Sequence, residues 1–134
     1  MGPGVPENIT VTFLNPTTVR VSWSTTAELV EKYDVTYKPS DASYRVVLDV
    51  AGNSDAVILS GLEADTQYQV TVAALWGGHK YRSRPIVFRT LGEFLYFIIN
   101  IYLNYYRSIT DNSFVFFFKL RFDICFLVRV PTDD

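Results

Sequence analysis

The sequence is poor in the residues that most often carry out chemistry. Its 134 residues include one cysteine, Cys125, and one histidine, His79. A single cysteine excludes an intrachain disulfide. A lone histidine, with no cysteine or second histidine near it, cannot build a usual zinc site or a Cys–His or Ser–His pair. There is also no glycine-rich phosphate loop, because Gly77-Gly78 is a turn signal. We therefore predict a protein that is not an enzyme and that needs no metal or cofactor.

The chain also lacks a strong charge of either sign. Twelve Lys and Arg residues stand against fourteen Asp and Glu residues, for a net charge of −2. Proteins that bind nucleic acid usually concentrate positive charge on one face, so this balance argues against a nucleic-acid partner. No apolar run follows Met1 as it would in a signal peptide. If the domain is extracellular, we expect this chain to be part of a longer protein.

The composition changes sharply near Gly92. Before it, short alternating runs are separated by turn residues. From residue 93 to residue 130 there is no glycine or proline, and eight of the ten phenylalanines lie in that stretch. The sequence therefore predicts a domain over residues 5–91, followed by an atypical apolar, aromatic-rich tail over residues 92–134.

Period-two alternation predicts seven strands in the first segment, where helical periodicity is weak. The strands are centred on residues 9–13, 19–24, 33–38, 44–50, 57–59, 68–74 and 86–90. Gly77-Gly78 marks a hairpin between the last two. Short strands at regular spacing, each with one apolar face, predict an all-β fold, a seven-stranded antiparallel sandwich of two sheets.

The predicted core consists of the inward-facing residues of these strands. Trp23 is its largest member, and its loss to alanine is expected to cost about 3–5 kcal/mol. The full set is Val19, Val21, Trp23, Val35, Tyr37, Val46, Leu48, Leu59, Leu62, Tyr68, Val70, Val72 and Phe88.

The order and spacing of the motifs resemble the immunoglobulin-like fibronectin type III family over nearly all of residues 5–91. Residues 8–11 resemble its opening strand, and VRVSW at residues 19–23 resembles its second strand with the buried tryptophan. The most specific piece is LSGLEADTQYQVTV at residues 59–72. It resembles the family's leucine-to-tyrosine corner, which implies that the Tyr68 hydroxyl bonds to backbone upstream. The family usually has proline where this chain has Ala64.

The resemblance implies a non-catalytic protein–protein binding or spacer module of an extracellular matrix or cell-adhesion protein. One alternative is an ectodomain module of a cell-surface receptor, such as a receptor kinase or phosphatase. Another is an intracellular scaffold module. The family's Arg-Gly-Asp adhesion signal is absent from residues 76–82, so integrin binding through that motif is not supported.

One basic cluster lies before the last predicted strand. It contains His79, Lys80, Arg82 and Arg84. Such a cluster can bind an acidic glycosaminoglycan or an acidic partner. It can also be a solvated loop beside an edge strand, where cations discourage edge pairing, and we favour this second interpretation.

Two aromatic residues, Trp76 and Tyr81, flank the turn at the start of this cluster. They either contribute to an interface, where exposed aromatics are enriched, or pack on each other across the hairpin. Trp76, His79, Lys80, Tyr81, Arg82 and Arg84 together form the candidate partner-binding loop.

The triplet Asn8-Ile9-Thr10 is an N-glycosylation sequon. The first strand of such a sandwich lies at a sheet edge, which favours modification, whereas placement within a strand reduces access. Asn8 is therefore a candidate glycosylation site of a secreted glycoprotein. A glycan there would exclude the intracellular alternative.

The tail is apolar but too short to cross a membrane. Residues 94–106 form an apolar run of thirteen residues that includes Asn100 and Asn104. A spanning helix needs about twenty, so no transmembrane span is predicted. Residues 118–125 alternate as a strand does, without a partner sheet of their own.

The tail's composition suggests an unusual origin. Phe, Tyr, Ile, Asn and Lys, whose codons are rich in A and T, make up half of it but about a sixth of the residues before it. Gly92-Glu93-Phe94 can also be encoded by a run that resembles a splice donor. We hypothesise that the tail is intron read-through, ahead of the alternatives of a genuine apolar partner segment or a membrane-surface helix.

Overall fold

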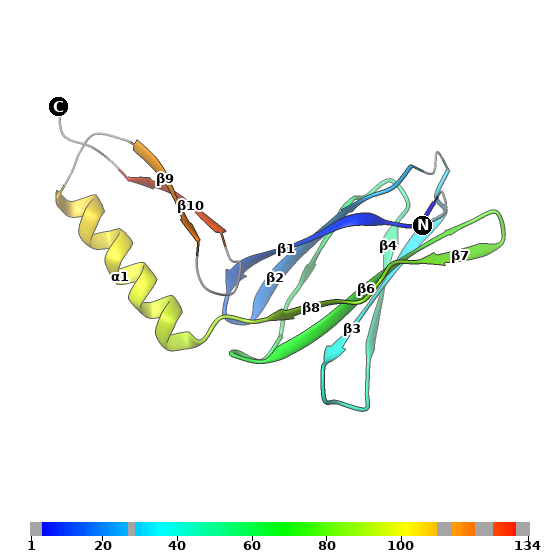
Figure 1. Ribbon diagram of the computed structural model, residues 1–134, viewed down its shortest axis with the longest axis horizontal. Helices are drawn as coiled ribbons and strands as arrows, with labels where there is room; N and C mark the ends of the chain where they lie inside the picture. The colour runs from blue at the N-terminus through cyan, green and yellow to red at the C-terminus, as the bar shows by residue number, and fades with distance from the viewer. Residues whose placement is uncertain (1–3, 27–28, 110–113, 120–124, 131–134) are drawn as a thin grey trace.

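The structure, a computed structural model, describes residues 4–26, 29–109, 114–119 and 125–130. Eight strands form the sandwich. They are β1 (Glu7–Asn15), β2 (Thr18–Ser24), β3 (Lys32–Pro39), β4 (Val46–Ala51), β5 (Ala56–Leu59), β6 (Gln67–Trp76), β7 (His79–Arg82) and β8 (Ile86–Arg89). They are followed by α1 (Glu93–Ile109), β9 (Phe114–Lys119) and β10 (Cys125–Val130). Figure 1 shows β8 leading into α1 at one end of the sandwich.

The eight strands form two antiparallel sheets. One has the order β1-β2-β5. The other has the order β4-β3-β6-β7, with β8 also paired to β6. In each strand the apolar residues alternate toward the space between the sheets, as the period-two pattern requires. This confirms the predicted all-β, two-sheet antiparallel sandwich.

The core lies between the sheets and contains the predicted residues except Val46; Tyr37 and Leu48 are half-buried and pack against it. Val46 and Leu48 are half-buried because β4 is an edge strand, covered by a neighbour on one side only. Tyr33, Ala74 and Leu91 are buried core residues that the sequence analysis did not name. The Tyr33 ring packs on Trp23 with centroids 5.1 Å apart.

The prediction of seven strands was wrong by one. Residues 79–82, assigned to a loop from the sequence, form β7, and both β7 and β8 pair with β6. Ser83 interrupts this last strand: its N–H donates to the Val72 carbonyl (2.8 Å) and its Oγ accepts from the Val72 N–H (3.0 Å). Pro85 then has no N–H to extend the ladder. The predicted hairpin at Gly77 and Gly78 is confirmed, since both have positive φ.

The tyrosine corner is also confirmed. The Glu63 N–H donates to the Tyr68 hydroxyl oxygen at 2.8 Å. The Asp65 N–H donates to the Leu91 carbonyl (3.0 Å), and the Thr90 hydroxyl donates to the Glu63 carbonyl (2.6 Å). These bonds hold the corner to the end of the last strand.

The tail forms a helix and a hairpin. Phe94, Phe97, Ile98 and Ile101 are exposed along one face of α1, at the i, i+3, i+4 and i+7 spacing of a helical stripe. β9 pairs with β10, so the prediction that this part of the tail has no partner sheet was wrong. Of the predicted strand 118–125, residues 120–124 lie outside the described part. Within that part, no helix has the length and apolarity needed to span a membrane.

Candidate partner-binding surfaces

The connections β2–β3, β4–β5 and β6–β7 meet at one end of the sandwich. The Glu31 N–H donates to the Leu75 carbonyl at the base of the β6–β7 hairpin (2.8 Å). Gly52 lies so close to Val30 that a Cβ there would collide with the Val30 carbonyl. We call this end, made of residues 25–26, 29–31, 52–55 and 76–81, the loop end. Figure 1 shows the start of β1 and the β6–β7 hairpin there.

The aromatic residues of the β6–β7 hairpin pack on each other. The rings of Trp76 and Tyr81 are stacked with centroids 4.8 Å apart and an interplanar angle of 18°. His79 meets the edge of Tyr81 at 6.2 Å and is exposed. Trp76 also packs against the core and against Gly4, where a Cβ would collide with the indole. The hairpin is thus an aromatic element in which His79 is the first residue after the Gly77-Gly78 turn.

The basic cluster is divided by the alternation of β7. Tyr81 lies opposite the buried Ala74, whereas Lys80 and Arg82 lie opposite Leu75 and Ala73, in rows that face away from the core. The Lys80 ammonium forms an ion pair with Asp34 at 3.0 Å. Most of the positive charge of Lys80 is therefore already neutralised within the sandwich.

Asp34 is a buried carboxylate with two cationic neighbours. Lys80 lies on one side at 3.0 Å and Lys32 on the other at 3.7 Å, while Lys32 also pairs with Asp49 at 3.3 Å. Burial raises the pKa of the Asp34 carboxyl. The hydrogen bond of Lys80, a hydrogen bond with Asp49 and the charges of Lys80 and Lys32 outweigh that effect and hold the pKa below its ordinary range.

Arg82 belongs to a different group of cations. With Lys38 and Arg45 it lines a hollow of about 300 Å³ on the outer face of the larger sheet. These residues come from β7, β3 and the residue before β4. The linear cluster therefore does not act as a unit: Lys80 is paired, Arg82 joins two distant cations, and Arg84 is exposed next to Pro85.

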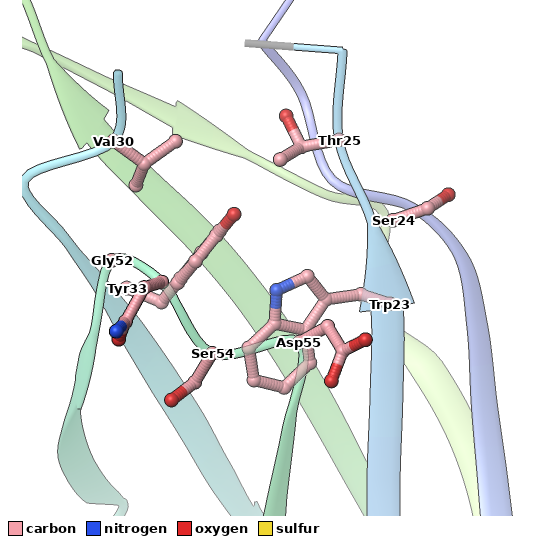
Figure 2. A pocket seen from close by; sticks show the side chains of 9 residues that line it. Trp23, Ser24, Thr25, Val30, Tyr33, Gly52, Ser54 and Asp55 are labelled. Atoms are coloured by element: carbon pink, nitrogen blue, oxygen red, sulfur yellow. The ribbon is translucent and has the colours of Figure 1, made fainter. Parts of the chain in front are cut away.

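A polar pocket of about 320 Å³ opens beside Trp23 at the loop end. Figure 2 shows the Trp23 indole nitrogen and the Tyr33 hydroxyl turned toward the same space, below Val30 and Thr25. Trp23 is 5% exposed, and its Nε1 has no hydrogen-bond partner among the described residues. Burial raises the pKa of the Tyr33 hydroxyl, and the facing Trp23 N–H, which lies outside hydrogen-bond geometry, opposes that rise only in part. Strand alternation predicted Trp23 as a core residue, but it predicted neither the burial of Tyr33 nor the pocket beside the two rings.

Asn8 lies in an irregular part of the edge strand β1. The β1–β2 register shifts between Glu7 and Thr10, and Asn8 has a φ of 53°. Its Nδ2 donates to Ser24 Oγ at 3.1 Å, and the residue is exposed. The bulge turns the amide toward solvent, which a regular strand position would not ensure. Elsewhere in the described chain, no three His, Cys, Asp or Glu residues gather as metal ligands would.

The fibronectin type III domain model matches residues 4–89. The chain belongs to the fibronectin type III family. Domains of this family occur in extracellular matrix, adhesion and receptor proteins, mediate protein interactions and are generally non-catalytic.

Individual proteins and domains of the fibronectin type III family are moderately similar to this chain in sequence. The collagen alpha-1(XII) chain of Oryctolagus cuniculus is 31% identical over 72 residues, which cover 53% of this chain and 11% of that protein. This chain therefore spans about a tenth of its relative's length. The fn3 domain of human collagen alpha-1(XX) chain is 28% identical with a TM-score of 0.57, covering 68% of this chain and 86% of that one. The FN5 domain of Drosophila Lar is 30% identical with a TM-score of 0.57, and the match covers 68% of this chain and 99% of that one.

Proposed function

We propose that this fibronectin type III domain is a non-catalytic binding and spacer module of a multidomain extracellular matrix or adhesion protein, and that its loop end contacts a protein partner. The observation that carries the proposal is the β6–β7 hairpin. Its stacked Trp76 and Tyr81 rings hold the exposed His79 next to the turn. Protein interfaces are enriched in tryptophan and tyrosine, and a side chain that is already fixed loses little entropy on binding.

The neighbouring pocket supports the same surface. The Asp55 carboxylate and the Ser54 hydroxyl line its opening. A partner hydroxyl or amide can donate a hydrogen bond to the carboxylate and exchange one with the hydroxyl. The loop end thus joins an aromatic element to a polar recess, the combination found in many protein interfaces.

The matrix context is supported by the collagen XII and collagen XX similarities. A second candidate, a module of a cell-surface receptor ectodomain, is supported by the similarity to the FN5 domain of Drosophila Lar. In both cases the chain is exposed to the secretory pathway, so Asn8 is expected to carry a glycan. The intracellular scaffold alternative predicts none.

Site-specific crosslinking tests the contact surface. A photoreactive residue replaces His79 in one variant and Ile58 in the matched control, since Ile58 is an exposed residue of β5 in the other sheet. Each variant is presented to intact extracellular matrix. We expect a discrete crosslinked protein from position 79 and none from position 58. Equal crosslinking from both positions would refute the loop end as the contact surface.

Mass spectrometry of the secreted chain tests the location. An N-glycan at Asn8 that disappears in the Thr10→Ala variant is expected, because that change destroys the sequon without altering Asn8. If an unmodified Asn8 were found in the natural protein within the cytoplasm, the scaffold alternative would replace the extracellular proposal.

A further inference from the structure

The outer face of the larger sheet carries a hollow of about 300 Å³ with a polar floor. Thr36 of β3 and Thr71 of β6 lie directly opposite each other in its lining, and Gln69 lies opposite Lys38 one row further along. Hydroxyl and amide groups therefore cover the floor. Both groups donate hydrogen bonds to anionic oxygens and exchange them with sugar hydroxyls.

Three cations surround this floor, and none has an anionic partner in the described part of the chain. Arg45 and Arg82 are exposed. Lys38 Nζ donates to the Ala42 carbonyl at 2.9 Å, a bond that positions the ammonium but leaves its charge uncompensated. No carboxylate belongs to the lining.

The carboxylates of the same sheet face are already neutralised. Asp34 is paired with Lys80 and Lys32, and Asp49 with Lys32. They lie opposite each other across β3 and β4, in a row that continues through Ala73 to Arg82. Because two lysines already pair with these two carboxylates, the charges of Arg45, Lys38 and Arg82 are left without an anionic partner among the described residues.

The cations are spread over the width of the sheet. Its order is β4-β3-β6-β7, so Arg45 before β4 and Arg82 in β7 are three strand spacings apart. At about 4.8 Å per spacing this amounts to roughly 14 Å between the strands. A single carboxylate or sulfate cannot reach both, whereas a chain with repeated anionic groups can.

We propose that this hollow binds a sulfated polysaccharide chain lying across β3 and β6, with sulfates at Lys38 and Arg45 on one side and at Arg82 on the other. An acidic protein surface fits less well, because the core of a protein interface needs protruding aromatic or aliphatic anchors. The aromatic residue in the lining, Tyr37, packs against the core instead. The inference is independent of the loop end, which lies on a different surface.

Direct binding of a heparin octasaccharide to the full chain tests this inference. Arg45→Gln and Arg82→Gln each remove one charge from the hollow. The matched control, Arg20→Gln, removes one exposed charge from β2 in the other sheet. We expect a loss of affinity of about threefold for each hollow variant and about tenfold for the double variant, from the usual strength of exposed ion pairs. Arg20→Gln should leave the affinity unchanged, and added salt should weaken binding.

Three results would overturn the proposal. The octasaccharide could fail to bind at low salt, or Arg20→Gln could weaken binding as much as Arg45→Gln, which would indicate a non-specific charge effect. A poly-glutamate peptide could also bind as tightly as the octasaccharide and compete with it, which would assign the hollow to an acidic polypeptide. All three arginines are exposed, and equal melting temperatures of the variants would show that the fold is intact.

Discussion

Side-chain hydroxyl groups form hydrogen bonds with the backbone of the corner before β6, and the Tyr68 hydroxyl is the clearest case. It accepts the Glu63 N–H at 2.8 Å, and Tyr68 is 4% exposed. The change Tyr68→Phe keeps the ring but removes the acceptor. We expect the free energy of unfolding to fall by about 1–2 kcal/mol, because the Glu63 N–H loses its partner. Chemical denaturation measures this.

The matched control for Tyr68→Phe is Tyr37→Phe. Tyr37 is half-buried in the same sheet, and its hydroxyl has no hydrogen bond in the part of the chain that the structure describes. Its loss should change stability by less than about 0.5 kcal/mol. Equal effects of the two changes would contradict a special role for the corner.

Asp34 makes stability depend on acid pH. Its pKa is lowered in the folded state, so its contribution is fully present above the ordinary aspartate range and is lost as the pH falls through the lowered value. We expect Asp34→Asn to flatten the decline in unfolding free energy between about pH 5 and about pH 2. Denaturant titrations at several pH values measure the slope. Asp41→Asn, which removes an exposed carboxylate outside this cluster, should leave that slope in place.

Residue roles were predictable where one side chain acts on nearby backbone. The Tyr68 corner followed from a family motif, and the burial of Trp23 followed from strand alternation. The pairing of Lys80 with Asp34 could not be predicted, because the two residues are far apart in the sequence. They become neighbours only because β7 and β3 both flank β6. The unpaired Trp23 N–H likewise depends on how two loops pack.

At the scale of elements, the β6–β7 hairpin depends on two glycines. Gly77 and Gly78 have φ values of 59° and 77°, and a Cβ at either would meet no atom within 4 Å. A substitution therefore strains only the backbone. We expect Gly77→Ala and Gly78→Ala each to cost about 1 kcal/mol of unfolding free energy. Thermal or chemical unfolding detects this loss.

Gly92→Ala is the control for the hairpin glycines. A Cβ at Gly92 would make an ordinary contact, 3.9 Å from the Asp65 Cβ, and its φ lies outside the positive region. Its replacement should cost nothing measurable. A similar loss at all three positions would show that the hairpin conformation is not the cause.

Two elements were misjudged from the sequence for different reasons. The residues of β7, HKYR, contain one apolar side chain, so they carry no alternation signal and pair only because β6 is long enough to accept them. The apolar residues of α1 do recur at a helical period. The segment was compared mainly with the length of a membrane-spanning helix, so a shorter amphipathic helix stood only as an alternative.

At the scale of the molecule, the sandwich is expected to fold without its tail. The hydrophobic core cluster and the residues packed against it lie between Ile9 and Phe88. A chain ending at residue 92 should therefore melt cooperatively at the same temperature as the full chain, or higher, because it loses exposed apolar surface. Circular dichroism with thermal unfolding measures both. If only the full chain folds, the predicted boundary and the read-through hypothesis are both wrong.

The cationic hollow is a feature of the whole molecule that the sequence alone did not predict. The linear cluster at residues 79–84 drew attention to the hairpin, yet the cationic hollow combines Arg82 with Lys38 and Arg45. Those three become neighbours through the strand order β4-β3-β6-β7. Alternation predicts which residues face outward, but it does not predict which strands stand side by side.

The position of the two ends of the sandwich has a mechanical consequence. Gly4 lies against Trp76, at the end of β6, and Leu91 is bonded to Asp65, just before β6 begins. The ten residues of β6 span about 33 Å, so the chain enters and leaves at opposite ends of the long axis. Tension applied through flanking segments would act along the strands and shear the β1–β2 and β6–β8 hydrogen bonds together. Such a module would hold its length under load and then yield in a single step.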